Sequence, residues 1–410
     1  MRPVWLLLVA LTACSGTAVP EAPTEVPRRV QEELSALQLT VLEEIREVVA
    51  DNFVYPDFGG GDWESLTSLA RLRIEDGLTD DEFGNAIDDM LAALPEGTAG
   101  FMTRAERVEA EFQSGTLYEG IGAFVSFRSE PLPRVLLLSV IAGSPAEEAG
   151  LRAHDAVYRV DDFPVTEEEG LSIIERVRGP AGTEVLLEVA SPAEDPREVM
   201  VRRDRVTAAD TLKGDVLPPG MIYLLVPVAV DDSLAERVAG LLQLSELEEE
   251  PALGLVLDLR IAGSSSNWPL TEMLTLLGNG DMGHFASRIA EQPVVITGVD
   301  LANSQSIPLA ILVGPDTSGA PEVFAGAMQA IGRASLVGLP TGGSVLSFRQ
   351  QTLSDGSLLT FAESSYFTPS GSDLSLTGLT PDLRIQADWD EVTPESDPVI
   401  QDAIELLIQG

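Results

Sequence analysis

The chain changes its hydrophobic period several times, and each change predicts a different kind of element. Between residues 30 and 94, apolar residues recur every three or four positions, which is typical of amphipathic helices. Three such helices are expected, at Val30–Phe53, Ser65–Ile74 and Asp80–Leu94. A region of short, strand-like runs follows, and the second half of the chain alternates strands with helices. This order predicts a mixed protein of two or three domains.

Residues 116–203 have the pattern of a small, mainly β module. Strands are expected at Phe124–Phe127, Arg134–Val140 and Glu184–Val189, with a helix at Glu167–Val177. A glycine-containing turn, Gly120-Ile121-Gly122-Ala123, leads into the first strand. Glycine has no β-carbon, so the backbone of such a turn can be approached closely.

Residues 203–219 are interpreted as a linker, and alternating strands and helices follow it. The run Ala252–Arg260 is apolar enough to be a central strand buried on both faces. Further strands are expected at Met221–Val228, Val294–Val299 and Leu309–Val313, and helices at Ser233–Leu242 and Pro269–Leu277. A hairpin across Asp355-Gly356 and a final helix, Pro398–Ile408, complete the pattern. Such alternation predicts an α/β layer architecture.

The stretch from 314 to 344 combines a helix, a strand and a glycine-rich turn. Pro321 suits the first turn of the helix, Gly332 can end it, and Asp316, Thr317 or Ser318 can cap it. A hydroxyl residue just ahead of a helix N-terminus also lies where backbone N–H groups and the helix dipole can stabilise an oxyanion. Ser318 is therefore either a helix cap, which the pattern favours, or a nucleophile.

Together these features resemble the C-terminal processing (tail-specific) serine peptidases, and residues 116–203 resemble a PDZ domain of the bacterial protease type. The resemblance rests on the order of Gly254–Arg260, Glu322–Gly338, Phe367–Gly371, Gly378–Asp382 and the closing helix. It implies an α/β peptidase core with ClpP/crotonase-like layers, a helical N-terminal region and an inserted PDZ domain. The expected divisions are 1–13 signal peptide, 14–29 tether, 30–112 helical region, 116–203 PDZ domain, 204–385 core and 386–410 C-terminal helix.

In that family a nucleophilic serine precedes the helix, and a lysine base lies in the glycine-rich turn. Counting back from Glu322 places the family serine at Gly319, one residue beyond Ser318. The family lysine position falls on Ser344, and the only lysine, Lys213, lies in the predicted linker. A serine hydroxyl cannot act as a base at neutral pH, and arginine stays protonated. The resemblance therefore implies a serine-type peptidase whose serine–lysine pair is not intact.

The other candidate catalytic groups are few. Backbone N–H groups of Gly263, Ser264 and Gly319 are candidates for an oxyanion hole. Of the two histidines, His154 is interpreted as an incidental surface-loop residue. His284 falls in a peripheral strand region, where a role in a catalytic triad is not favoured. Two distant histidines without a cysteine cluster predict no metal site, and no cofactor motif is present.

Charge and the N-terminus indicate where the protein acts. The formal net charge of −41 makes nucleic acid an unsuitable partner.

The N-terminus resembles a bacterial lipoprotein signal peptide, with an ordinary signal peptide as the alternative. It has Arg2, then the apolar run Val4–Leu11, and then the motif Leu11-Thr12-Ala13-Cys14. In the lipoprotein interpretation, Cys14, the only cysteine, is lipidated. The protein would then be exported across the inner membrane and anchored at the periplasmic face of the outer membrane, with no internal disulfide.

The leading hypothesis is a lipid-anchored, catalytically impaired homologue of the tail-specific peptidases. It would bind unfolded polypeptides or polypeptide C-termini through Gly120, Ile121, Gly122 and Ala123. The alternative is an active serine endopeptidase that cleaves proteins near their C-termini with Ser318 as nucleophile. A third possibility is a purely structural envelope lipoprotein whose PDZ groove is closed.

Overall fold

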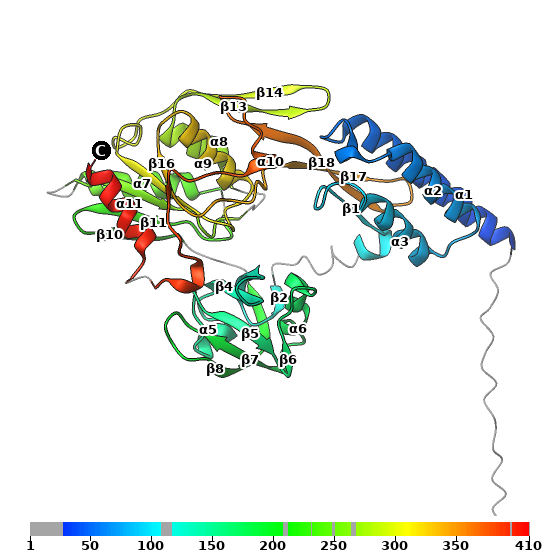
Figure 1. Ribbon diagram of the computed structural model, residues 1–410, viewed down its shortest axis with the longest axis horizontal. Coiled ribbons are helices and arrows are strands. Elements are labelled where there is room, and N and C mark those ends of the chain that lie inside the picture. The colour runs from blue at the N-terminus through cyan, green and yellow to red at the C-terminus, as the bar shows by residue number, and fades with distance from the viewer. Residues whose placement is uncertain are drawn as a thin grey trace, which may run out of the picture.

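The computed structural model describes residues 28–107, 117–207, 212–230, 232–247, 251–263, 268–393 and 396–409. The predictions for the signal peptide, the tether and Cys14 lie outside these residues, as does the oxyanion candidate Ser264. Figure 1 shows a helical region at one end, a large α/β core and a smaller module below them.

The predicted N-terminal helices are confirmed as α1 (Arg28–Asn52), α2 (Trp63–Glu75) and α3 (Asp80–Leu91), with a short 3₁₀ turn, Phe58–Gly60, between the first two. Thr79 caps α3 in a reciprocal capping box with Glu82, which explains why this helix starts where it does. The apolar faces of the helices pack with Leu359 and Phe361 of the core. Strand β1 (Ala99–Met102) pairs with strand β18, so the helical region is attached to a core sheet.

The predicted PDZ module forms a sheet in the order β3-β4-β5-β7-β8, and a two-residue strand, β6, pairs with β5. The bounds are β3 Ala123–Arg128, β4 Arg134–Val140, β5 Ala156–Val160, β6 Phe163–Pro164, β7 Glu184–Ala190 and β8 Arg197–Arg202. A separate pair joins β2 (Leu117–Gly120) to β9 (Asp204–Thr207). The helices are short: α5 (Pro145–Glu148), a 3₁₀ turn (Gly170–Ile173) and α6 (Ile174–Val177). The helix predicted at Glu167–Val177 is thus only partly formed.

The main sheet of the core has the order β10-β11-β12-β15-β16-β19 and is parallel except for β10. Its strands are β10 Lys213–Leu217, β11 Met221–Leu225, β12 Gly254–Asp258, β15 Leu309–Val313, β16 Ser335–Gly338 and β19 Leu383–Arg384. One face packs against α7 (Leu234–Glu246), α8 (Leu270–Leu277) and α9 (Ala320–Ala330), and the other against α11 (Pro398–Gln409). Burial on both faces explains the continuous apolar runs of the central strands.

A second sheet lies beside these layers and carries the predicted hairpin. It has the order β1-β18-β13-β14, with β17 paired to β18. The bounds are β13 Gly280–Ser287, β14 Glu291–Ile296, β17 Ser347–Thr352 and β18 Leu358–Phe367, and the short helix α10 (Leu374–Thr377) follows. A 3₁₀ turn, Trp389–Glu391, precedes α11.

The prediction of a linker over residues 203–219 is wrong, because β9 and β10 lie in this stretch. Strand β10 is hard to recognise from sequence, since four of its five residues are exposed and its two apolar residues, Val216 and Leu217, are adjacent and do not alternate with polar ones. Its strand conformation comes from pairing with β11, in the register Lys213↔Leu225 to Leu217↔Met221.

Candidate functional site

The turn before α9 is fixed to the end of the central strand by Thr317. The Thr317 hydroxyl donates to the Leu259 carbonyl at 2.8 Å and accepts the Gly314 N–H at 3.0 Å. Thr317 is fully buried, so this position is determined by the core. The turn therefore presents the next residue, Ser318, from a rigid base.

Ser318 does not cap the helix, so the favoured interpretation of this residue is wrong. The N-cap position is Gly319, and no side chain makes a capping hydrogen bond. Gly319 has φ 65° and ψ −133°, which turns the chain sharply between Ser318 and α9. The Ser318 N–H donates to the Ala262 carbonyl at 3.2 Å, while no described residue makes a hydrogen bond with its hydroxyl.

The structure brings Ser318 and the oxyanion candidate Gly263 together. A β-carbon placed on Gly263 would lie 3.8 Å from the Ser318 Oγ. The Gly319 N–H, the other described candidate, instead donates to the Ser344 carbonyl at 2.8 Å. In this arrangement the Gly319 donor is occupied by the protein itself.

No basic group contacts the Ser318 hydroxyl within the ranges that the structure describes. Lys213 lies on β10, at the far edge of the main sheet. His284 lies on β13, and its ring stacks on Phe367 with 5.3 Å between the ring centroids. Ser344 occupies the position where the resemblance expects a lysine, and its side chain is exposed. A general base must lie within hydrogen-bond reach of the proton that it removes, and none of these groups does.

A second site lies in the PDZ module, where an apolar cavity of about 380 Å³ opens beside the edge strand β3. Its walls include Ile121, Ala123, Val125, Ile174 and Val177. Among the described strands β3 pairs with β4 alone, so the other edge of β3 can accept a further strand. Three of the four predicted peptide-binding residues, Ile121, Gly122 and Ala123, border this cavity, whereas Gly120 ends β2 just before it.

The turn that leads into β3 requires glycine at position 122. Gly122 has φ 86°, and a β-carbon there would lie 2.3 Å from the Ser144 β-carbon. The Gly122 carbonyl accepts the Ile141 N–H at 3.0 Å and the Ser144 hydroxyl at 3.2 Å. The Ile121 carbonyl accepts the Ala146 N–H at 2.8 Å. The turn is therefore held from inside the module.

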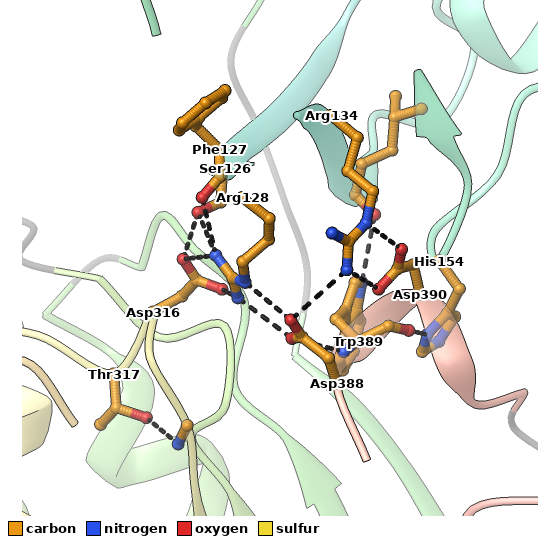
Figure 2. A network of polar contacts seen from close by, with 12 residues as sticks. Ser126, Phe127, Arg128, Arg134, His154, Asp316, Thr317, Asp388, Trp389 and Asp390 are labelled. Carbon is orange, nitrogen blue, oxygen red and sulfur yellow. Dashed lines mark hydrogen bonds and ion pairs between the residues drawn. The ribbon is translucent and has the colours of Figure 1, made fainter. Parts of the chain in front are cut away.

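An ion-pair network joins β3 to the turn that carries Ser318 (Figure 2). The Arg128 guanidinium lies 2.6 Å from Asp316 and 2.8 Å from Asp388, and the Ser126 hydroxyl also contacts Asp316. Arg134 pairs with Asp390 at 2.6 Å. Although burial opposes ionisation of Asp388, the Arg128 guanidinium holds the pKa of this carboxyl below its usual value.

The interpretation of His154 as an incidental surface residue is also wrong. His154 is 9% exposed, and its ring stacks on Trp389 with 4.0 Å between centroids. Its Nδ1–H donates to the Trp389 carbonyl at 2.7 Å, and the Trp389 indole N–H donates to the Leu137 carbonyl at 3.1 Å. Arg260 of the core lies 5.3 Å from the Trp389 ring. Trp389 therefore connects the PDZ module to the core, which a local sequence pattern could not reveal.

Comparison with known proteins decides the family. Residues 233–385 match the profile of peptidase family S41, and residues 137–191 match that of the PDZ domain. The chain belongs to the C-terminal processing peptidases of family S41 and contains a PDZ domain. It is 29% identical over 355 residues to a carboxyl-terminal-processing protease of Synechocystis sp., covering 80% of this chain and 78% of that protein.

Other relatives support the same assignment. Carboxyl-terminal-processing peptidase 3 of Arabidopsis thaliana, a chloroplastic protein, is 23% identical over 414 residues, covering 96% of this chain and 78% of the relative. Among solved structures, a photosystem II D1 C-terminal processing protease superimposes with a TM-score of 0.65 at 23% identity, over 90% of this chain and 97% of that one. This likeness confirms the predicted fold: an S41 core with a PDZ domain and a helical N-terminal region.

In this S41 core, Gly319 stands where the resemblance places the nucleophile, and its conformation is informative. A positive φ is unfavourable for residues with a β-carbon, so glycine relieves strain at this position. Hydrolases of another fold hold their catalytic serine on a similarly sharp turn at the start of a helix. The turn before α9 is similarly sharp, but Gly319 at its apex has no side chain.

Glu322 lies in the S41 core, although in the sequence it served only as the reference for locating the family serine position. It is fully buried, and its Oε1 accepts hydrogen bonds from the Thr341 hydroxyl and the Gly343 N–H, the latter at 2.9 Å. Its Oε2 has no partner among the described residues. Burial raises the pKa of Glu322 above its usual value, although these hydrogen bonds oppose the shift. The sequence did contain a signal for a special role of Glu322: it is an acidic residue on the apolar side of a helix.

The described residues contain no group of three or more His, Cys, Asp or Glu side chains that could hold a metal ion. Across the same ranges, no helix has both the length and the apolar character needed to cross a bilayer.

Proposed function

We propose that this S41-family protein is a catalytically impaired homologue that binds polypeptide C-termini through its PDZ domain. The observation that carries the proposal is the isolation of the Ser318 hydroxyl from every basic group of the described residues. Gly319 and Ser344 occupy the positions of the family serine and lysine, so neither half of that pair is in register. A serine hydroxyl is a weak nucleophile unless an adjacent base activates it, and no described residue supplies such a base to Ser318.

The PDZ domain supplies the binding function in this proposal. A peptide would add as a strand to the open edge of β3, and an apolar side chain would enter the cavity between β3 and α6. The terminal carboxylate would lie at the turn of Gly120 to Ala123, of which Ile121, Gly122 and Ala123 border this cavity.

Fluorescence anisotropy with a labelled peptide that ends in an apolar residue tests the binding function. We expect saturable binding that is lost when the terminal carboxylate is amidated, and also in Ile174→Glu, which places a charge in the groove. Met200→Gln is the matched control, because Met200 is 53% exposed on β8, at the opposite edge of the sheet. Equal binding of the amidated peptide would contradict recognition of C-termini.

The alternative function, an active serine endopeptidase, is favoured by one observation: the Ser318 hydroxyl makes no cap and lies beside Gly263. Incubation of an unfolded protein with the wild type and with Ser318→Ala separates the two functions. We expect no cleavage by either protein. Cleavage by the wild type that disappears in Ser318→Ala would establish the peptidase instead.

We also propose that the protein is a lipoprotein of the bacterial envelope, exported and anchored through Cys14 at the periplasmic face of the outer membrane. The support is the order of Arg2, the apolar run and the Leu11-Thr12-Ala13-Cys14 motif. Metabolic labelling with a fatty acid should mark the wild type and not Cys14→Ser. Labelling of both proteins would contradict anchoring at Cys14.

A further inference from the structure

A cavity of about 590 Å³ lies between the PDZ domain and the core, away from the PDZ groove. We call it the interdomain cavity. Its floor is the β10–β11 hairpin, the opposite wall is the PDZ domain around His154, and Trp389 and Ile400 close one side. This volume falls within the range of about 300–1,000 Å³ that is common for small-molecule sites, which often lie at domain interfaces.

The floor of the cavity follows from strand alternation. Lys213, Asp215 and Leu217 lie on the same face of β10, because side chains of a strand alternate between its two faces. The strand register places Lys213 opposite Leu225 and Asp215 opposite Tyr223. Both partners line the cavity as well. The floor therefore presents one cation and one anion on an otherwise apolar surface.

Lys213 and Asp215 are the charged groups of the cavity that have no ion-pair partner within the described ranges. The Asp215 Oδ1 accepts only the neighbouring Val216 N–H, at 2.8 Å. The other charged groups of the lining are already engaged: Arg152 contacts Glu194, and Arg260 lies 2.7 Å from both Asp258 and Asp397. An unpaired cation and an unpaired anion two residues apart are complementary to a zwitterion.

His154 adds a directional hydrogen-bond acceptor to the cavity. Its Nδ1–H is donated to the Trp389 carbonyl, so the lone pair of the neutral ring is on Nε2. Burial lowers the pKa of His154, which keeps the ring neutral near pH 7. The aliphatic part of the wall includes Leu138, Ile261 and Ile400, while Ser139 and Thr393 add neutral polar groups. A ligand would therefore need an N–H donor and an apolar side chain in addition to its two charges.

We propose that the interdomain cavity binds a short zwitterionic peptide with an apolar side chain. The peptide carboxylate pairs with the Lys213 ammonium, the terminal ammonium pairs with Asp215, and the side chain packs on the aliphatic walls. Alternate residues of a strand are about 6.6 Å apart, which is roughly the span of two residues of extended chain. A dipeptide therefore matches the two charges. This site is separate from the PDZ groove and does not depend on its function.

Isothermal titration calorimetry on the full chain, with the dipeptide Ala-Leu as probe, tests the proposal. We expect saturable binding to the wild type, and binding at least about tenfold weaker for the same dipeptide acetylated and amidated at its ends. Lys213→Gln should weaken Ala-Leu binding about fivefold or more. Val216→Thr is the matched control: Val216 lies on the other face of the same strand, is 66% exposed, and should leave the affinity unchanged.

Three results of these titrations would overturn the proposal. They are absence of binding, equal affinity for the capped dipeptide, and wild-type affinity in Lys213→Gln. Binding that is lost in Ile174→Glu would assign the dipeptide to the PDZ groove and would also overturn it. We expect Ile174→Glu to bind Ala-Leu as the wild type does, because this residue lines only the groove.

Discussion

The Arg128 guanidinium lies 2.6 Å from the Asp316 carboxylate and so joins the edge strand of the PDZ domain to the turn that carries Ser318. Their side chains are 13% and 14% exposed, so water screens the pair only weakly. Asp316 is two residues from Ser318, and Arg128 ends the strand to which a peptide would be added. The binding groove and the candidate catalytic turn are therefore connected through one ion pair.

Arg128→Ala should destabilise the protein substantially. Removing Arg128 leaves Asp316 without its counter-charge in a mostly buried position and leaves Asp388 with the more distant Arg134, at 3.9 Å, which we expect to cost about 3 kcal/mol. Urea unfolding followed by tryptophan fluorescence would measure the loss, since Trp389 lies at this interface. Arg349→Ala is the control: its pair with Glu363 is about 40% exposed and should contribute less than about 1 kcal/mol. Equal losses of unfolding free energy in both variants would contradict a special stabilising role of Arg128.

Acidification should weaken the contact between the PDZ domain and the core through His154. Burial is the main cause that lowers the pKa of His154 from its usual 6.5. As the pH falls through 6.5, the unfolded chain binds a proton that the folded ring still excludes, so the free energy of unfolding decreases. The decrease stops once the pH is below the folded pKa. Unfolding of the wild type between pH 8 and pH 5 should show this loss.

His154→Phe is the matched comparison, because phenylalanine keeps a ring beside Trp389 but does not titrate. The difference in unfolding free energy between wild type and variant should shrink as the pH falls below 6.5. A difference that stays constant from pH 8 to pH 5 would contradict the role of His154.

Glu322 should make the core less stable as the pH rises. Its raised pKa means that the folded state keeps a proton above the usual value of 4.5, where the unfolded chain has lost it. The free energy of unfolding therefore falls as the pH rises through this window. Glu322→Gln should remove the dependence while keeping an acceptor for Thr341 and Gly343. Chemical unfolding at pH 4.5 and pH 7.5 would measure it.

Glu322→Ala separates the role of charge from that of hydrogen bonding. Loss of the acceptor leaves the Thr341 hydroxyl and the Gly343 N–H unsatisfied in the core, at about 1–3 kcal/mol for each group. This variant should be the less stable of the two at both pH values. Equal stability of Glu322→Ala and Glu322→Gln would show that the hydrogen bonds to Thr341 and Gly343 do not contribute to the free energy of unfolding.

Restoring both missing groups should create peptidase activity. Gly319→Ser combined with Ser344→Lys would place a hydroxyl and an amine at the positions that the family resemblance indicates. The backbone conformation of Gly319, with φ 65° and ψ −133°, would add a strain of about 1–3 kcal/mol to a residue with a β-carbon. We expect cleavage of an unfolded protein by the double variant and not by either single one. Gly319→Ala with Ser344→Lys, which carries the same strain without the hydroxyl, should stay inactive, and activity there would contradict the design.

Hydrophobic periodicity was enough to predict the architecture, because burial imposes this local pattern on each element. The helices at the N-terminus, the central strand after Ala252 and the helix after Ser318 were all predicted with boundaries close to those observed. The absence of the family lysine was also evident, since Ser344 and Lys213 can be read directly from the sequence. The glycine-containing turn at residues 120–123 was also identified in the sequence, and the structure adds that Gly122 has a φ of 86°.

Which residues meet across elements depends on tertiary packing and could not be predicted from the sequence. Strand β10 has no local pattern and exists because it pairs with β11. Ser318 fits a helix cap in sequence, but the conformation of Gly319 moves it out of that position. His154 and Trp389 are 235 residues apart, and their stacking depends on how two domains pack. Contacts of this kind arise from the packing of distant segments, which hydrophobic period and local propensity do not specify.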